Sequence, residues 1–411
     1  MARASRCSDF ILAACVAAAA VIVSPLGIEL AIGRADLSLR VTAISLTFAG
    51  FLAIFAAAVL AQRWLRRALL YLLAGVFPLA VLAALEAIAV SVHLADVVAP
   101  LEDTSLLANK TPWPTYLLTD SSYYHHTADG LILYHPWQGP GVAFNQLGLR
   151  TAMPTPKKPG EWRIAVTGGS AAWGWHVFDA DTIPVQLQGI LRATGHPNVT
   201  VYNFGIGGVS LKHELALLKK FRDVYGIDQV LFYTGGNDVF FSYTSAANKD
   251  YGAWVGAVQS FELVKLAARL QAMWSTPTPQ AMQRFDNEVL PRALKISTFN
   301  KDIAAADEYC RAAKLRCDFA LQPVMSERKT HSGAEAAMEK TLARVYPRLD
   351  VLAKRMYADA MAVGPPGHVF NLTHIFDNST TPYFLDFVHL NEAGNRIAAE
   401  NVAPIASAQL P

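Results

Sequence analysis

The first quarter of the sequence is dominated by long apolar runs. Residues 10–32, 41–61 and 68–93 contain almost no charged side chains. Each run is close to the roughly 20 residues that an α-helix needs to cross a bilayer, and is too long and too apolar for an ordinary core helix. The runs therefore predict a membrane anchor over residues 1–94 with three transmembrane helices.

The first of these runs allows a second interpretation. Arg3 and Arg6 precede a stretch of alanines, as in a signal peptide, and Pro25 and Glu29 interrupt the run. A retained helix is favoured because two more apolar runs follow it and because it outlasts a typical signal-peptide core.

The positions of the basic residues predict the orientation of the anchor. Lysine and arginine concentrate in the cytoplasmic loops of membrane proteins. An N-terminus in the cytoplasm puts everything after residue 94 outside, in the periplasm of a Gram-negative host. Arg3, Arg6, Arg63, Arg66 and Arg67 then lie inside, no further Lys or Arg follows the third run before Lys110, and Arg34 and Arg40 oppose this orientation.

The overall charge argues against a nucleic-acid partner. The 411 residues carry a formal net charge of +2, and no basic stripe of the kind that follows a phosphate backbone is present.

Cys310 and Cys317 lie in the part of the chain predicted to be exported, where an oxidising compartment permits a disulfide. Their spacing suits a bridge from the end of a helix to the next strand, and two buried free thiols are equally consistent with it.

Residues 95–160 form a connecting segment rich in proline, glycine and aromatic residues. The clusters at residues 123–126 and 131–134 are too apolar for a disordered tether. We expect them to form short strands that pack on the domain that follows.

From residue 161 to residue 411 the pattern predicts an α/β domain. Short apolar strands are expected at residues 164–167, 199–204, 229–233, 318–321 and 369–372, with helical segments such as 182–194 and 211–225 between them. Parallel strands require crossovers, so the alternation predicts a three-layer α/β/α sandwich around a parallel sheet. Two longer helical segments, 241–299 and 326–364, are expected to pack on the sheet or to form a lid or an acyl-binding wall.

Three glycine-rich blocks follow the first three strands, at the edge where parallel sheets place their functional groups. Gly168-Gly169-Ser170 exposes a hydroxyl, Gly207-Gly208 permits close approach of a backbone amide, and Gly235-Gly236-Asn237-Asp238 presents a side-chain amide. Each block is also ordinary turn sequence when taken alone.

A fourth block lies before the last helix. Asp386 and His389 are three residues apart, which permits the carboxylate to hold the imidazole while its other nitrogen faces a serine. An isolated Asp-x-x-His pair is usually structural. No His-Glu-x-x-His or Cys-x-x-Cys is present to complete a metal site, and no cofactor is implied. Together the four blocks supply the nucleophile, base, orienter and oxyanion donors that acyl transfer requires.

In their order and content these blocks resemble those of the SGNH, or GDSL-type, hydrolases, over residues 163–406. The resemblance implies the flavodoxin-like fold of that family, with Ser170 as nucleophile and Asp386 and His389 completing the triad. The amides of Ser170, Gly208 and Asn237 would form the oxyanion hole. Gly169 departs from the pattern, since many relatives have aspartate before the serine.

The resemblance implies a carboxyl-ester hydrolase acting on an acylated small molecule, lipid or polysaccharide, and the predicted orientation of the anchor puts it outside the cytoplasmic membrane. Envelope proteins are the partners to expect there. The alternative is an O-acyltransferase or deacetylase of cell-envelope or exported polysaccharide. A non-catalytic carbohydrate-binding module is a third hypothesis. Trp173, Trp175, Phe240, Phe241 and Tyr243 are candidates for a substrate wall or for ordinary core, and His176 and His213 are expected to make structural hydrogen bonds.

Overall fold

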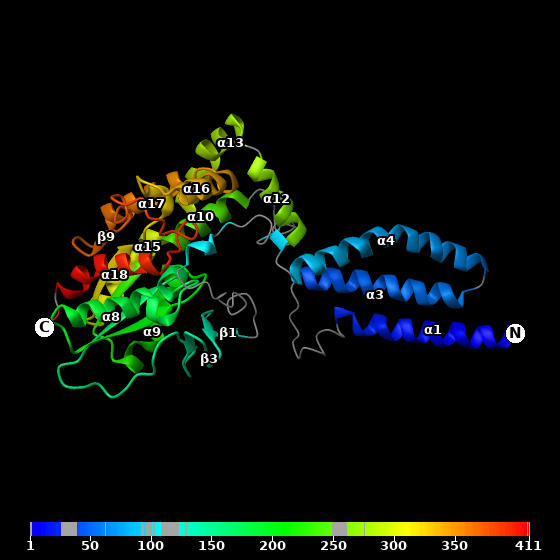
Figure 1. Ribbon diagram of the computed structural model, residues 1–411, viewed down its shortest axis with the longest axis horizontal. Helices are drawn as coiled ribbons and strands as arrows, with labels where there is room; N and C mark the ends of the chain where they lie inside the picture. The colour runs from blue at the N-terminus through cyan, green and yellow to red at the C-terminus, as the bar shows by residue number, and fades with distance from the viewer. Residues whose placement is uncertain are drawn as a thin grey trace. The chain divides into compact units, whose positions relative to one another are not determined.

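The computed structural model describes residues 2–25, 39–61, 63–91, 94–95, 101, 103–107, 123–127, 130–248, 261–274, 276–408 and 410. The chain divides into two compact units, residues 1–100 with 248–275, and residues 101–247 with 276–411 (Figure 1).

The first unit is helical. It contains α1 (Ala2–Ile22), α3 (Leu39–Leu60), α4 (Arg63–Ser91) and α12 (Glu262–Trp274). Two of these helices are long and apolar enough to cross a membrane, over Thr42–Leu60 and Arg67–Val90, with mean hydropathies of 2.3 and 2.4. The first predicted span is described only in part, with an apolar stretch at Leu12–Ile22, because residues 26–38 lie outside the described residues. A third span therefore stays a prediction.

Helix α12 differs from the expectation that residues 241–299 pack on the sheet, because it belongs to the helical unit. Its first turn is held by Glu86 of α4, whose two carboxylate oxygens accept hydrogen bonds from the backbone amides of Glu262 and Leu263. Glu262 in turn accepts a hydrogen bond from the Ala95 amide, at 3.2 Å. These contacts satisfy the open amides of a helix N-terminus, and they make α12 part of the helical unit.

The second unit is built on a five-stranded parallel sheet, as the alternation predicts. The strand order is β6-β5-β7-β8-β9, the flavodoxin-like order in which the strand of this sheet that comes first in the chain, β5, lies inside the sheet. The strands are β5 (Trp162–Gly168), β6 (Val199–Gly205), β7 (Gln229–Thr234), β8 (Arg316–Leu321) and β9 (Val369–Asn371).

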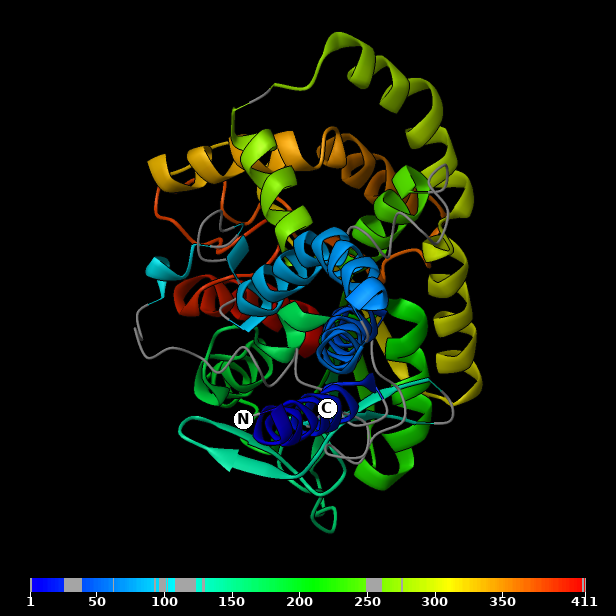
Figure 2. The ribbon, with the colours of Figure 1, turned by 90° about the vertical axis from the view of Figure 1, so that its right-hand side faces the viewer.

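Both faces of the sheet are buried, because successive side chains of a strand point to opposite faces. Ile164 and Val166 join one apolar cluster and Ala165 joins the other. Helices α8 and α18 lie side by side against the first cluster (Figure 1 and Figure 2), and α9, α15 and α17 contribute to the second. The helices of this unit are α7 (Ser170–Trp173), α8 (Ile183–Ala193), α9 (Leu211–Tyr225), α10 (Gly236–Asn248), α13 (Pro279–Arg284), α14 (Leu290–Ile296), α15 (Phe299–Ala312), α16 (Gly333–Val345), α17 (Leu349–Val363) and α18 (Glu392–Ser407).

The connecting segment forms two antiparallel hairpins. The first pairs β1 (Tyr124–His126) with β2 (Ile132–Tyr134), and the second pairs β3 (Trp137–Gly139) with β4 (Val142–Phe144). Tyr134 and Phe144 stack on Trp173, the last residue of α7, with ring centroids 5.5 and 5.9 Å away. The hairpins therefore support the helix that begins at Ser170.

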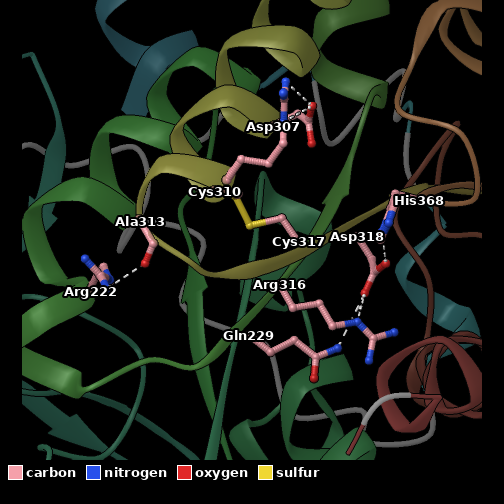
Figure 3. Close-up of a disulfide and its surroundings, with 10 residues drawn as sticks. Arg222, Gln229, Asp307, Cys310, Ala313, Arg316, Cys317, Asp318 and His368 are labelled. Atoms are coloured by element: carbon pink, nitrogen blue, oxygen red, sulfur yellow. Dashed lines mark hydrogen bonds and ion pairs between the residues drawn. A yellow bond between two sulfur atoms is a disulfide. The ribbon is translucent and has the colours of Figure 1, made fainter.

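Cys310 at the end of α15 and Cys317 in β8 form a disulfide, with their Cα atoms 6.1 Å apart (Figure 3). Of the two states consistent with the sequence, the structure has the bridge from a helix end to the next strand. Asp318, beside it on β8, forms an ion pair with Arg316 at 3.1 Å and contacts His368 at 2.9 Å.

Candidate active site

The three glycine-rich blocks lie side by side because their strands are neighbours. Strand β5 is between β6 and β7, and Gly168 pairs with Gly205 on one side and with Tyr233 on the other. The loops that follow these strands therefore leave the sheet at the same edge, as predicted.

The two glycines before Ser170 are required by close packing. A Cβ atom on Gly168 would lie 2.3 Å from the carbonyl oxygen of Tyr233, and one on Gly169 would lie 2.3 Å from Nδ2 of Asn237. Because Gly169 has no side chain, the amide of Asn237 can lie directly against the backbone at this position, next to Ser170. This contact explains why no aspartate occupies that position in this chain.

The three predicted triad residues meet. Ser170 Oγ lies 2.6 Å from His389 Nε2, and His389 Nδ1 lies 2.6 Å from Asp386 Oδ2. Ser170 and His389 are 219 residues apart in the sequence. Ser170 is the first residue of α7, at the end of the strand inside the sheet, and the loop before α18 brings His389 to it.

Asp386 is buried but held in its ionised form. Burial alone would raise the pKa of this carboxyl, yet the charge and hydrogen bond of His389 and two backbone amides hold the pKa below its usual value. Those amides are Val388 N and His389 N, 2.8 and 2.7 Å from Oδ1. The carboxylate is therefore available to fix the imidazole tautomer at neutral pH.

A buried ion pair holds the loop that carries Asp386 and His389. Arg328 contacts Glu335 at 2.6 Å, and both side chains are fully buried. Glu335 Oε1 also accepts hydrogen bonds from the amides of Tyr383 and Phe384, at 2.9 and 3.1 Å. No motif in the sequence indicated this pair.

Of the two remaining predicted donors, Asn237 lies against the nucleophile block, and Gly208 directly precedes Val209, to which Asn237 is hydrogen-bonded. Asn237 Nδ2 donates to the carbonyl oxygen of Val209 at 2.7 Å, which fixes the side chain against Gly169. Gly208 has a φ of +70°, in the left-handed region that favours glycine, and open space where a Cβ would stand. An amide side chain has two hydrogens, so Asn237 keeps one to donate beyond Val209.

A buried arginine of the connecting segment holds the chain that follows Ser170. Arg150 donates to the carbonyl oxygens of Trp173, Gly174 and Val177 at 3.1, 2.7 and 2.7 Å. Its Nε contacts Asp179 at 2.6 Å. Sequence reasoning missed this residue, because a single arginine in a loop carries no periodic or motif signal.

The aromatic and histidine candidates divide between site and core. Trp175 stacks on the imidazole of His389, with ring centroids 5.4 Å apart. Trp173 and Tyr243 are core residues, and Phe240 packs on Tyr346 and Phe387. Phe241 is partly exposed. Of the two histidines, His176 lies edge-on to Trp175, and His213 contacts Ser210. Within the described residues, no group of three or more His, Cys, Asp or Glu side chains is arranged to hold a metal ion.

Replacing Gly169 by alanine is expected to lower kcat/KM for the ester hydrolysis that the sequence blocks predict by about 10²- to 10³-fold, the range for loss of one oxyanion donor. The new methyl group requires the Asn237 amide to move, while the contact between Ser170 and His389 needs no change. The matched control is Gly189→Ala in α8, where a Cβ meets nothing within 4 Å. Steady-state kinetics of both variants check the prediction, and an unchanged Gly169→Ala enzyme contradicts it.

Two more buried carboxyls lie behind the third block. Burial raises the pKa of Asp238 to about 7, partly offset by the Leu211 amide at 3.3 Å. Burial and the charge of Asp238 raise the pKa of Glu214 well above its ordinary value, although Thr234 donates to Glu214 at 2.9 Å. Both carboxyls thus resist ionisation in the folded protein.

This shift predicts a pH-dependent effect of Asp238→Asn. Between the ordinary pKa of an aspartate, about 3.9, and the raised value, the unfolded chain releases a proton that the folded protein keeps. Rising pH therefore lowers the stability of the wild type, and the asparagine variant does not lose stability in this way. We expect the Tm difference, variant minus wild type, to grow from pH 4 to pH 7. Asp223→Asn, whose side chain is 87% exposed, is the control, and a flat or shrinking difference for Asp238→Asn would refute the assignment.

No family model and no curated protein matches the sequence. Solved structures with a similar arrangement include the acetyl xylan esterase AlAXEase, at 16% identity over 60% of this chain and 99% of that chain, with a TM-score of 0.32. A member of the lipolytic protein G-D-S-L family from Veillonella parvula has 13% identity over 60% and 97%, with a TM-score of 0.33. A variant of Axe2, an acetyl xylan esterase from Geobacillus stearothermophilus, has 14% identity over 58% and 91%, with a TM-score of 0.33.

Proposed function

We propose that this protein is a serine esterase of the SGNH type, with Ser170, His389 and Asp386 as its triad. The observation that carries the proposal is the continuous chain of two 2.6 Å contacts, from Ser170 Oγ through the imidazole of His389 to Asp386. A serine, histidine and aspartate in this order form the arrangement that activates a hydroxyl for attack on an acyl carbon.

In the first half of the reaction, Ser170 Oγ attacks the carbonyl carbon of an ester while His389 Nε2 takes the hydroxyl proton. Asp386 keeps its charge and stabilises the imidazolium. The amides of Ser170 and Gly208 and Nδ2 of Asn237 donate to the developing oxyanion. Collapse of the intermediate expels the alcohol, which takes its proton from His389, and leaves an acyl group on Ser170.

In the second half, a water molecule gives a proton to His389 and attacks the acyl carbon, and the acid leaves as Ser170 regains its proton. A sugar hydroxyl in place of the water would turn the same residues into an O-acyltransferase. Hydrolysis is the simpler outcome because it needs no acceptor site.

We place the reaction outside the cytoplasmic membrane. The apolar stretches Thr42–Leu60 and Arg67–Val90 support an anchor, since only 17% of each is buried inside the protein. The disulfide between Cys310 and Cys317 supports an oxidising compartment for the second unit. We propose that the anchor has three spans and a cytoplasmic N-terminus. Residues 95–160 then act as part of the catalytic unit.

The test is hydrolysis of p-nitrophenyl acetate, butyrate and octanoate by the full chain in detergent micelles. We expect release of p-nitrophenol with saturation kinetics and a preference for one chain length. A folded protein that releases none, yet moves an acyl group from an activated donor to a polysaccharide, would replace the esterase with the acyltransferase. Absence of both reactions would overturn the enzyme assignment.

A further inference from the structure

Trp175 covers one face of the imidazole of His389. The indole and the imidazole are stacked, with 27° between the two ring planes and 5.4 Å between the centroids. The edges of the imidazole have other partners, because Nε2 faces Ser170 and Nδ1 faces Asp386, each at 2.6 Å. Trp175 therefore contacts the one group through which the proton of the reaction passes, and does so on a side that the two triad partners leave to it.

The backbone on both sides of Trp175 has an unusual conformation. The two neighbouring residues have positive φ angles, +100° at Gly174 and +61° at His176. A side chain at Gly174 is excluded, since a Cβ atom there would lie 2.5 Å from Cγ2 of Thr182. A histidine in the left-handed region is strained, and such residues persist where the surrounding structure imposes the conformation, often at functional sites.

Hydrogen bonds tie this turn to the nucleophile. The backbone amides of Gly174 and Trp175 both donate to the carbonyl oxygen of Ser170, at 3.0 Å. Arg150 donates to the carbonyl oxygens of Gly174 and Val177, each at 2.7 Å. One short, fixed segment thus brings both the hydroxyl of Ser170 and the indole of Trp175 to the same imidazole.

The charge of that imidazole changes during the proposed reaction. His389 becomes an imidazolium when it takes the proton of Ser170. The face of an indole attracts a cation within about 6 Å of the ring centroid, and does so more strongly than the face of a phenyl ring. Trp175 is within that distance, so it stabilises the charged ring more than the neutral one. The other groups to consider are Asp386, at the opposite edge of the imidazole, and His176, whose ring centroid is 4.8 Å from that of Trp175.

We propose that Trp175 is a positioning residue of the triad, which keeps the imidazole of His389 directed at Ser170 and stabilises the imidazolium that forms there. The proposal rests on the proposed function, because it adds a residue to that reaction. From the sequence alone, Trp175 was a candidate for a substrate wall or for the core. Its stacking on His389 assigns it to the triad instead.

The kinetic test follows kcat/KM and kcat for p-nitrophenyl acetate from pH 5 to pH 9 in the full chain. Trp175→Leu keeps an apolar side chain beside His389 but removes the ring face that attracts the imidazolium. The pKa of His389 then falls, and we expect the midpoint of the acid limb of kcat/KM to move down by about 0.4–1.5 pH units. We expect kcat on the plateau to fall about 3- to 30-fold, because the imidazolium also forms in the transition state.

The direction of the pH shift separates this role from simple packing. If Trp175 only filled space, a shorter side chain would let water reach the imidazole, which favours its charged form and raises the midpoint. Trp175→Phe keeps a ring face and should recover most of the wild-type midpoint. The matched control is Trp162→Leu at the start of β5, the opposite end of that strand from Ser170, and it should leave the midpoint in place. An unchanged or raised midpoint in Trp175→Leu would overturn the proposal.

A fluorescence titration tests the contact without any ester. The emission of the full chain minus that of its Trp175→Phe variant isolates this indole. We expect the difference to fall as His389 becomes protonated, because an imidazolium in contact with an indole quenches its emission. The fall should vanish in His389→Gln and persist in His176→Asn, each measured against its own Trp175→Phe partner, since asparagine tolerates the left-handed backbone at that position.

The two tests fail in different ways. A difference that does not titrate, or that still titrates in His389→Gln, would rule out the role of Trp175 even in a chain that cleaves esters. A chain that shows the expected titration but cleaves no ester would instead contradict the proposed function.

Discussion

Replacing Ser170 by alanine is expected to lower kcat for ester hydrolysis by about 10⁴- to 10⁶-fold. The alanine removes the only atom that forms the acyl-enzyme bond, and His389 then has no hydroxyl to deprotonate. Activity above that of water persists because the oxyanion donors stay in place. Steady-state rates with p-nitrophenyl acetate, at matched protein concentration, measure the effect.

The fold should tolerate this change, since only the hydroxyl oxygen is lost. The control is Ser407→Ala at the end of α18, whose hydroxyl donates within its own helix, to Pro404 O. It is expected to keep wild-type rates. A Ser170→Ala protein that retained more than a tenth of wild-type kcat would remove Ser170 from the mechanism.

Replacing Arg150 by methionine is expected to lower the free energy of unfolding of the catalytic unit by about 3–5 kcal/mol, the range for removal of one partner from a buried charged network. The Arg150 side chain is fully buried, and the change leaves the carbonyl oxygens of Trp173, Gly174 and Val177 without this donor. Because these carbonyls directly follow α7, we also expect kcat to fall. The midpoint of urea unfolding, followed by tryptophan fluorescence, gives the stability.

Arg150→Lys tests whether the forked guanidinium is needed. A lysine ammonium is a single charged centre and does not reach three carbonyls and Asp179 together, so most of the loss should remain. Arg396→Ala on α18 is the control, because its pair with Glu400 is exposed and such pairs contribute about 0–1 kcal/mol. An Arg150→Met protein within 1 kcal/mol of the wild type would mean that the connecting segment does not support the nucleophile loop.

The parallel sheet was predictable from the sequence because its strands are buried on both faces and read as apolar runs between helical segments. The Asp386–His389 contact was predictable too, since it spans three residues. The contact between Ser170 and His389 follows only once the strand order puts β5 inside the sheet, and the resemblance to a known family supplied that order.

Other features depend on contacts between distant segments that leave no local pattern. Arg150 acts on carbonyls more than 20 residues away, and Glu335 holds a loop almost 50 residues on. Helix α12 was expected to pack on the sheet. The spacing of its apolar residues indicates that it has an apolar face, but does not indicate which surface that face packs against. The helix is held by Glu86, which lies 176 residues before Glu262 in the chain.

Covalent labelling of the full chain with a fluorophosphonate shows directly whether Ser170 is an activated nucleophile. An activated serine oxygen forms a bond to phosphorus and fluoride leaves, so peptide mass spectrometry identifies the residue. We expect one adduct, on the peptide that contains Ser170, and its loss in His389→Ala. A folded wild-type protein that stays unlabelled, or is labelled at another serine, would contradict it.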